Sequence, residues 1–502
     1  MWKELSKVAL LGTERSHLSD ATKNNLANHG IHMDAEETQI LLESAAFFAQ
    51  VNKAAFLLPI FQGKSKIAID DSNEQIASPK STHHLNLILN GDYERALPEF
   101  ITHLEKNKKQ LSPKNLPDLL NKCLESRAFW QKIKKAIGKR GWWLLEQNPA
   151  WQTLEILPSP DTWATGSKEE RIAFLTSFRE QDPLNTLEIM LATWDKESWR
   201  DKVAFLQGLS IGLSKTDEVF LEDCLYDGRK EIRTAAANLL VAIPDSELVE
   251  RMYLRIEALI YFEKEHLKID LPDEPDETAI RDGIDTKSKK YAGQKTGILH
   301  QMLATIPPSR WEDFFAGSPE KVLKLFYQNE WSKTLIKAMV EATILHKNKD
   351  WAKPLLEMWL HLGNSDLWKT KQMLAISEVL SPDIFHQIAT QHLEKNRHLL
   401  NEKSPILQLL IGVSHLWSDH LAMLTIGRFQ QWLVAAPSNF WDNDYYKNLL
   451  YEAAYKTSPH LLEKMKLGWE RSSQAWGLWE TEVEQFLRVL IFRKEMINEL
   501  AA

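Results

Sequence analysis

Cysteine is scarce in this sequence. Cys123 and Cys224 are its only two cysteines, and they stand far apart without forming a CxxC pair. A secreted domain held together by disulfides needs more cysteines than this, and a cysteine-rich zinc site needs paired ones. The sequence therefore argues against both classes of protein, and we expect a reducing compartment, the cytoplasm.

Long apolar runs are also missing. None approaches the roughly 18 to 20 residues that a membrane span requires. Residues 1–5 also do not begin an export signal, which would have a basic start, an apolar stretch and a cleavage site with small residues. We therefore expect no export and no membrane partner. The formal net charge of −8 repels polyanions unless basic residues cluster on one face, so nucleic acid is a disfavoured partner.

Metal-binding motifs are absent as well. A zinc hydrolase would show a pattern such as HExxH, and the sequence contains none. The close histidine pairs lack a third ligand at a recognisable spacing, so we interpret them as surface or capping residues. They are His29 and His32, His83 and His84, and His415 and His420.

Residues 293–297, with the sequence GQKTG, superficially resemble a phosphate-binding loop. Ser288 stands where the first glycine of that motif belongs, Gln294 replaces its lysine, and no apolar strand leads into it. We therefore expect neither nucleotide hydrolysis nor a cofactor, and no catalytic residue can be named.

Helix signals, in contrast, occur throughout the chain. At six places a side chain that can cap a helix precedes a proline suited to the first helical turn. These places are Ser112-Pro113, Asp182-Pro183, Ser318-Pro319, Ser381-Pro382, Ser404-Pro405 and Ser458-Pro459. Strand signals are few, and residues 66–69 form the clearest.

Apolar periodicity supports the same fold class. Residues 331–344 and 351–360 each carry an apolar stripe with a period near 3.6, which predicts a helix hairpin, and Ser167 and Glu170 predict a capping box. A chain of 502 residues is too long for one compact core unless it grows by repetition. We therefore predict an all-α fold, an α-solenoid of HEAT-like helix pairs with two arcs.

Two stretches interrupt the helical pattern. One lies near residues 59–81, and the other, at 269–296, is first acidic and then basic, with little to bury. We use them to divide the chain. The division is a helical region at 1–158, HEAT-like repeats at 159–268, a linker or insertion at 269–296 and further helical repeats at 297–502.

Residues 199–251 carry the clearest repeat. Three apolar helical faces occur there, and Asp227, Arg229 and Arg233 precede the adjacent alanines of the third. This resembles the signature of HEAT-like repeats, an acidic residue and arginines before an alanine-rich second helix. We expect these three side chains to bond across the turn or to a neighbouring repeat.

A wider resemblance rests on residues 10–15, 138–144, 148–151 and 217–246. These segments are similar to an uncharacterised bacterial family of HEAT-like helical proteins, and the match spans most of the chain. That family has no established activity. It is associated with gene clusters that encode MoxR-type AAA ATPases and von Willebrand factor A proteins. The resemblance implies such a protein as the partner and assigns no functional residues.

A basic and aromatic stretch offers candidate partner-binding residues. Positive side chains followed by aromatic ones are the chemistry that holds phosphates and stacks bases. The simpler alternative is a solvated helix face that runs into buried tryptophans. The candidates are Lys135, Lys139, Arg140, Trp142 and Trp143.

Tryptophan is unusually abundant, with 19 residues, and most fall on apolar stripes where a large ring fills the space between helices. Exposed ones, such as Trp142 or Trp476, would instead be anchors for a partner. We therefore expect a non-catalytic scaffold that binds a protein. The alternative is a nucleic-acid-binding HEAT-like protein resembling alkylated-base DNA glycosylases, which requires a basic concave face.

Overall fold

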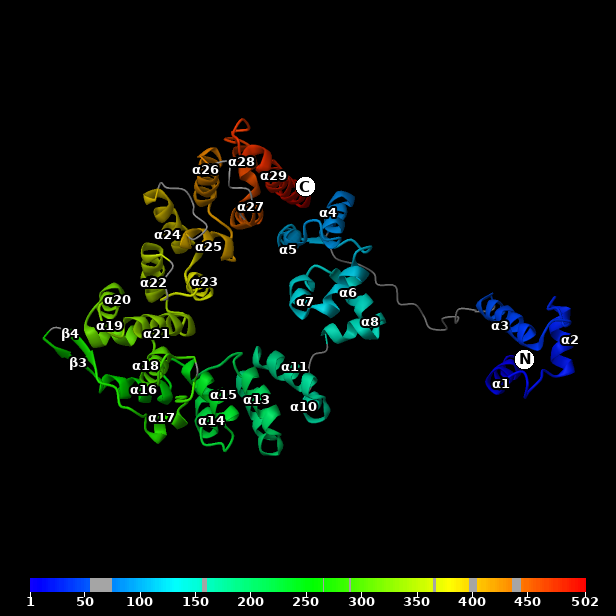
Figure 1. The fold of residues 1–502 in the computed structure, drawn as a ribbon, viewed down its shortest axis with the longest axis horizontal. Coiled ribbons are helices and arrows are strands. Elements are labelled where there is room, and N and C mark those ends of the chain that lie inside the picture. The colour runs from blue at the N-terminus through cyan, green and yellow to red at the C-terminus, as the bar shows by residue number, and fades with distance from the viewer. Residues whose placement is uncertain are drawn as a thin grey trace. The chain divides into compact units, whose positions relative to one another are not determined.

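The chain is almost entirely helical. The computed structural model describes residues 1–54, 75–155, 160–264, 266–288, 290–363, 367–396, 404–435 and 444–502. It divides into two compact units, Met1–Ala68 and Ile69–Ala502 (Figure 1). The all-α fold class is confirmed. Most of the loop expected near 59–81, and the weak strand signal at 66–69, lie outside the described residues. Among the described residues, no helix combines the length and apolar composition that crossing a bilayer requires.

Unit 1 is a small group of three helices. They are α1 (Trp2–Leu11), α2 (Asp20–Asn28) and α3 (Glu37–Ala54). Leu5, Val8, Leu26 and Ile40 belong to its core. The Glu4 carboxylate accepts hydrogen bonds from the Thr22 hydroxyl at 2.5 Å and from the Ser19 N–H at 2.6 Å. These bonds lower the pKa of Glu4 to about 2 and tie α1 to the start of α2.

Unit 2 begins with a cluster of short elements. They are β1 (Gln75–Ile76), α4 (Pro79–Leu89), η1 (Glu94–Ala96), α5 (Leu97–Lys106), β2 (Lys109–Gln110), α6 (Leu116–Glu125), α7 (Arg127–Ile133), α8 (Gly138–Gln147), α9 (Pro149–Gln152) and η2 (Thr153–Glu155). Strand β1 pairs in parallel with β2. The last helix of the chain, α29 (Trp476–Ala501), packs against α4 and α5 and contributes Phe492, Met496 and Leu500 to their core.

The rest of unit 2 is a succession of helix pairs. The first helices are α10 (Pro160–Thr165), α11 (Lys168–Arg179), α12 (Pro183–Leu191), η3 (Trp194–Lys196), α13 (Trp199–Gly208), η4 (Lys215–Asp217), α14 (Glu218–Cys224), α15 (Lys230–Val241), α16 (Glu247–Glu257) and α17 (Glu277–Arg281). They are followed by α18 (Gln294–Thr305), α19 (Ser309–Phe315), α20 (Pro319–Tyr327), α21 (Ser332–Leu345), α22 (Lys349–Leu362), α23 (Thr370–Val379), α24 (Pro382–Lys395), α25 (Pro405–Gly412), α26 (Asp419–Ala435), α27 (Asp444–Lys456), η5 (Pro459–Leu461) and α28 (Leu462–Met465).

These helices form two layers, because alternate helices are neighbours. In one layer α18, α21, α23, α25, α27 and α29 contact one another in turn, and in the other α20, α22, α24 and α26 do. In Figure 1 the first layer faces the middle of unit 2 and the second faces outward. Each added pair buries apolar surface against the pair before it, so the core grows with chain length.

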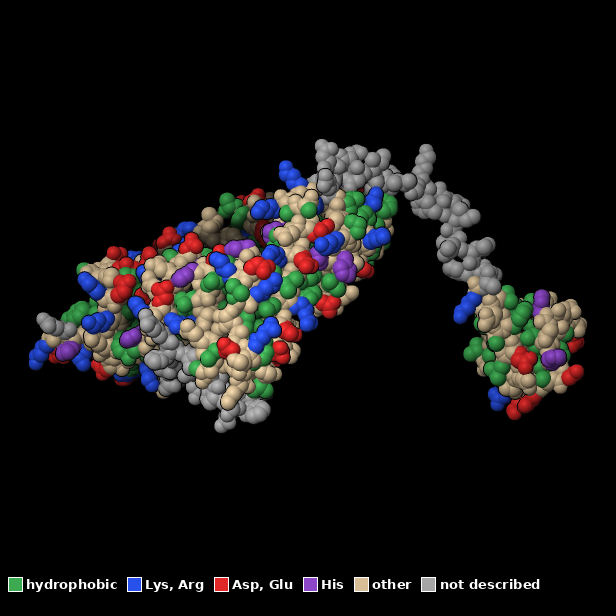
Figure 2. All heavy atoms as spheres, turned by 90° about the horizontal axis from the view of Figure 1, so that it is seen from above, with side chains coloured by type: hydrophobic (Ala, Val, Ile, Leu, Met, Phe, Trp, Pro, Cys, Tyr) green, Lys and Arg blue, Asp and Glu red, His purple; other side chains and the backbone are tan. Residues whose placement is uncertain are grey.

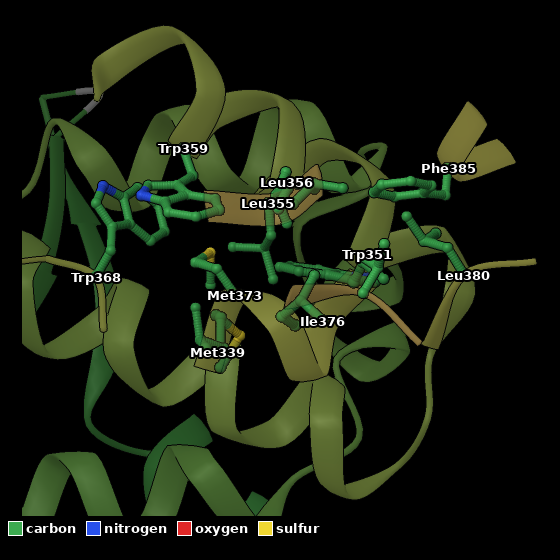
Figure 3. Packing of buried hydrophobic residues seen from close by; sticks show 14 of the residues in the cluster. Met339, Trp351, Leu355, Leu356, Trp359, Trp368, Met373, Ile376, Leu380 and Phe385 are labelled. Carbon is green, nitrogen blue, oxygen red and sulfur yellow. The ribbon is translucent and has the colours of Figure 1, made fainter. Parts of the chain in front are cut away.

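Tryptophans fill the space between the layers. Figure 3 shows Trp351 and Trp359 of α22 packed with Met339 of α21 and Met373 of α23. Both rings are fully buried, as the apolar stripes predict. Trp476 is also buried, at 9% exposure, so the interpretation of this residue as an exposed anchor is wrong. Its ring lies at the start of α29 and contributes to the core instead.

The capping signals locate most of the helix starts that they predict. Helices α12, α20, α24 and α25 each begin at the expected proline, and the Ser167–Glu170 capping box begins α11. Ser458-Pro459 starts only a short 3-10 turn. The helix start predicted at Ser112-Pro113 is wrong. Helix α6 begins at Leu116 instead, and Pro117 occupies its first turn.

The described residues of segment 269–296 pack into the core of unit 2, although we expected a linker or an insertion with little to bury. The segment follows a hairpin of β3 (Ile260–Glu263) and β4 (His266–Ile269), which the sequence analysis did not predict. It contains α17 and buries Leu271, Ala279 and Ile284 in the core that continues on both sides. Its charged composition misled the prediction, because the buried side chains are widely spaced among polar ones.

Candidate functional site

The basic and aromatic candidates lie on α8 and on the turn between α7 and α8. Lys135, Lys139 and Arg140 are exposed and form no ion pair with any described residue. Trp142 is 38% exposed and meets the buried Trp130 ring edge to face. Trp143 is half-buried, and its indole N–H has no hydrogen-bond partner among the described residues. The stretch is thus a solvated face beside tryptophans that are partly buried.

Asp227, Arg229 and Arg233 form a local turn between α14 and α15. The Arg229 N–H donates to the Asp227 carboxylate at 2.8 Å, and the Arg233 guanidinium donates to the Asp227 carbonyl at 2.7 Å. Arg229 also reaches another helix, with its guanidinium carbon 5.8 Å from the centroid of the Trp199 ring on α13. Asp227 and Arg233 therefore bond across the turn, one of the two arrangements that we expected.

Other charged side chains join successive helix pairs. Arg179, at the end of α11, donates to both carboxylate oxygens of Asp217 at 2.8 and 2.9 Å, and both side chains are fully buried. Its remaining N–H groups reach backbone carbonyls of Pro183, Leu209, Ile211 and Gly212. A buried charge with every donor satisfied fixes the spacing of the two pairs.

A second such junction lies further along. The buried Asp282 carboxylate accepts hydrogen bonds from Arg251, Arg255 and Arg281 at 2.7–3.0 Å. Arg251 also pairs with Glu222 of α14. Burial raises the pKa of Asp282, but the three guanidinium groups outweigh it and hold the pKa below its usual range. These bonds anchor the segment after β4 to α16 and α14.

The most distinctive surface feature is a cavity of about 480 Å³ beside α18, α21 and α23, which we call the basic cavity. Four lysines, two carboxylates and two aromatic rings contribute to its wall, together with smaller polar residues. The lining residues are Lys290, Tyr291, Ala292, Thr296, His300, Glu330, Trp331, Lys333, Thr334, Lys337, Glu341, Lys369 and Gln372.

Glu341 is the centre of a polar network at this cavity. Its carboxylate lies 3.0 Å from His300 Nε2 and accepts hydrogen bonds from Lys290 at 3.2 Å and Gln372 at 3.3 Å. Burial raises the pKa of Glu341, but the bond with His300 and the charge of Lys290 lower it to about 2. The ring of His300, which is 4% exposed, lies 5.0 Å from that of Tyr291. The negative charge of Glu341 on α21 is therefore compensated by its neighbours, and its hydrogen bonds join α21 to α18 and α23.

Two of the lysines have no such compensation. Lys337 is half-buried and Lys369 is exposed, and neither side chain forms an ion pair or hydrogen bond with a described residue. Trp331 and Tyr291, both half-buried, give the wall apolar surface. The arrangement suits a ligand that carries negative charge and some apolar surface.

Comparison with known proteins gives this chain a family but assigns no site to it. Residues 4–500 match the sequence model of a family described as "Family of unknown function (DUF5691)". The chain belongs to this family. It matches no curated protein and no solved structure.

Nothing in the described part of this family member points to a metal centre or a reactive thiol. No group of three or more His, Cys, Asp or Glu side chains that could hold a metal ion occurs among the described residues. Cys123 and Cys224 are buried and unbridged, and burial raises the pKa of both thiols to about 12. They are packing residues, because a nucleophilic cysteine needs a thiolate.

Sequence reasoning missed the basic cavity of this family member, although two signals were visible. One is the basic run at 287–290, interpreted there as part of a linker. The other is the spacing of Lys333, Lys337 and Glu341, each four residues from the next, which aligns them on one helix face. Neither signal shows that a loop and two further helices bring His300, Tyr291 and Lys369 alongside.

Proposed function

We propose that this chain is a non-catalytic scaffold, a solenoid of HEAT-like helix pairs in the bacterial cytoplasm, that binds a protein partner. The observation that carries the proposal is the basic cavity, where Lys337 and Lys369 lack a charge partner among the described residues beside half-buried aromatic rings. Aromatic surface is enriched at protein interfaces, and a lysine without a counter-charge can attract a partner of opposite charge. An AAA ATPase or a von Willebrand factor A protein is the partner that the gene-cluster association of the similar family implies.

The junctions between helix pairs support a binding role. The buried Arg179–Asp217 pair and the arginines around Asp282 hold neighbouring pairs at fixed spacing. A surface that is ordered before binding loses less conformational entropy on association. Repeats of this kind therefore suit a platform that presents side chains from several helices to one partner.

The test is a binding measurement with purified proteins. The MoxR-type ATPase and the von Willebrand factor A protein from the same organism would each be titrated into the full chain by isothermal calorimetry. Micromolar or tighter binding of either one supports the proposal. A second experiment cross-links proteins in living cells and then purifies the tagged chain. If no protein is cross-linked to the chain, the proposal is contradicted.

A nucleic-acid-binding function is the alternative. It is favoured by the exposed Lys135, Lys139 and Arg140 beside the partly exposed Trp142. The face of unit 2 shown in Figure 2 weakens it, because positive and negative side chains are interspersed there. A nucleic-acid groove would instead gather charge of one sign.

Salt dependence separates the two functions. Fluorescence anisotropy would follow labelled duplex and single-stranded DNA at low and at physiological salt. A scaffold should bind DNA only weakly and lose it at physiological salt, because contacts from a few lysines weaken steeply as counterions compete. Sub-micromolar binding that persists, and disappears when Lys135, Lys139 and Arg140 are changed together to Glu, would establish the alternative.

A further inference from the structure

We infer that the basic cavity binds an extended acidic segment of the partner protein, through carboxylates that pair with Lys337 and Lys369. This inference rests on the proposed function, since it names the part of the partner that docks. It assigns a class of ligand to a site that contains neither the basic and aromatic candidates of residues 135–143 nor the turn residues 227–233.

The spacing of charges on α21 carries the first step. Lys333, Lys337 and Glu341 lie four residues apart along one face of the helix, and all three line the cavity. With a rise of 1.5 Å per residue, neighbours in this row are about 6 Å apart and the whole row spans about 12 Å. The binding surface is therefore elongated rather than a single point.

An extended peptide matches this row. Side chains on one side of an extended chain recur every second residue, or about 6.6 Å. One carboxylate of such a segment can pair with Lys337, and because the next one recurs at a distance close to one helical turn, the segment can continue along the row. About four or five extended peptide residues cover the row. A compact polyanion such as pyrophosphate would instead need donors that converge on one place.

The charge pattern sets the direction of the segment. At one end of the row, Glu341 is held by His300 and Lys290 and closes the cavity to a second carboxylate. Lys337 lies one turn before Glu341 on α21, and Lys369 directly precedes α23. Neither lysine is paired with a described residue. The acidic side chains therefore bind toward Lys337 and Lys369.

Aromatic rings complete the specificity. Trp331 directly precedes α21, and Tyr291 packs beside His300 at the other end of the row. Both rings are half-buried, so their outer surfaces can cover apolar groups of the bound segment. Acidic residues interspersed with apolar ones should consequently bind better than an acidic run alone.

The experiment uses a labelled peptide of alternating glutamate and serine as the probe, titrated into the full chain at low salt by fluorescence anisotropy. Changing Lys337 and Lys369 together to Glu should weaken binding about tenfold or more, because two attractions become repulsions. Changing both to Gln should give a smaller loss in the same direction. A peptide of alternating glutamine and serine should not bind.

The matched control is a change of Lys321 and Lys324 to Glu. These exposed lysines lie on α20, in the other layer and outside the cavity, so the variant changes net charge equally and should keep its affinity within twofold. Equal losses in both double variants, no binding by the unaltered chain, or full displacement by inorganic pyrophosphate would each overturn the inference. Thermal melting verifies that the variants fold.

The two proposals can fail separately. If the partner binds the unaltered chain and the Lys337 and Lys369 double variant equally well, the scaffold function stands and the cavity is not its acidic-segment site. If neither candidate protein binds but the acidic peptide does and depends on these lysines, the site stands and the identity of the partner is wrong.

Discussion

Arg493 and Glu99 form a two-point ion pair between segments that are 394 residues apart in the chain. The Arg493 guanidinium donates to the two carboxylate oxygens at 2.7 and 2.8 Å, and to the carbonyls of Ala454 and Thr457 at 2.6 and 2.8 Å. The arginine side chain is 2% exposed. Beside it, the rings of Phe492 and Tyr93 stack at 3.9 Å. The last helix thus holds α5, near the beginning of unit 2, by both polar and apolar contacts.

Replacing Arg493 by Met should destabilise unit 2. The change leaves the two carbonyls without their donor and Glu99 without its counter-charge, which we expect to cost about 3 kcal/mol. Urea unfolding would measure the loss. Lys494→Met is the matched control, because Lys494 pairs only at the surface with Glu463 and should change stability by less than about 1 kcal/mol. Equal effects of the two variants would contradict the role of Arg493.

Asp282→Asn should release the segment that follows β4. The substitution removes the only buried carboxylate shared by Arg251, Arg255 and Arg281 in the described structure, and breaking a buried pair of this kind costs about 3–5 kcal/mol. Limited proteolysis should cut residues 270–293 early in the variant but not in the unaltered chain. Asp285→Asn, at a partly exposed position in the same segment, is the control and should leave the pattern unchanged. Early cutting of the unaltered chain there would contradict this packing.

Ala236→Phe should destabilise α15 by overpacking. Ala236 is fully buried in the core between helices, so the larger ring has no space without shifting its neighbours, at a cost of about 1–3 kcal/mol. The melting temperature measures the effect. Asn238→Phe, at an exposed position of the same helix, is the control for the phenylalanine itself. An unchanged melting temperature for Ala236→Phe would show that this helix face is not packed.

The free energy of unfolding should depend on pH through the Glu341 carboxylate. Its pKa is lowered from 4.5 to about 2, so the ionised carboxylate stabilises the folded state at pH values above 4.5. That contribution, on the order of 2 kcal/mol, is lost progressively as the pH falls from 4.5 toward 2.

Comparison with Glu341→Gln isolates this effect from other carboxylates. The free energy of unfolding of the unaltered chain should exceed that of the variant at pH 6, and the difference should shrink by pH 3. Lys290, His300 and Gln372 remain as the facing groups in both proteins. A difference that does not change with pH would show that the Glu341 charge has no net interaction with them.

The basic cavity shows why a site of this kind escapes sequence reasoning. Each contributing segment has an unremarkable pattern: a basic run ending at Lys290, a helix with Lys337 and Glu341, and a lysine, Lys369, before the next helix. None forms a motif with fixed spacing in the chain. Only the packing of α18, α21 and α23 places Lys290, His300 and Gln372 around one carboxylate.

Other residues were interpreted as functional because of their residue type alone, and for these the sequence did not predict how exposed the side chain is. Trp142 and Arg140 were singled out for their residue types, and the structure places both at exposed positions of α8. Trp476 has the same residue type as Trp142, yet the structure buries it. Whether a tryptophan fills a core or faces solvent depends on which helix packs over it, and one apolar stripe does not specify that.

The sequence by itself determined the helices and many of their starts, such as those of α11 at Ser167 and α12 at Asp182. Capping bonds and apolar periodicity act within one or two turns, so neighbouring residues suffice to specify them. The tertiary structure alone decided the partners of Arg493, Asp282 and Glu341. These bonds form between segments far apart in the chain, and their geometry exists only after the apolar faces of the helices have packed together.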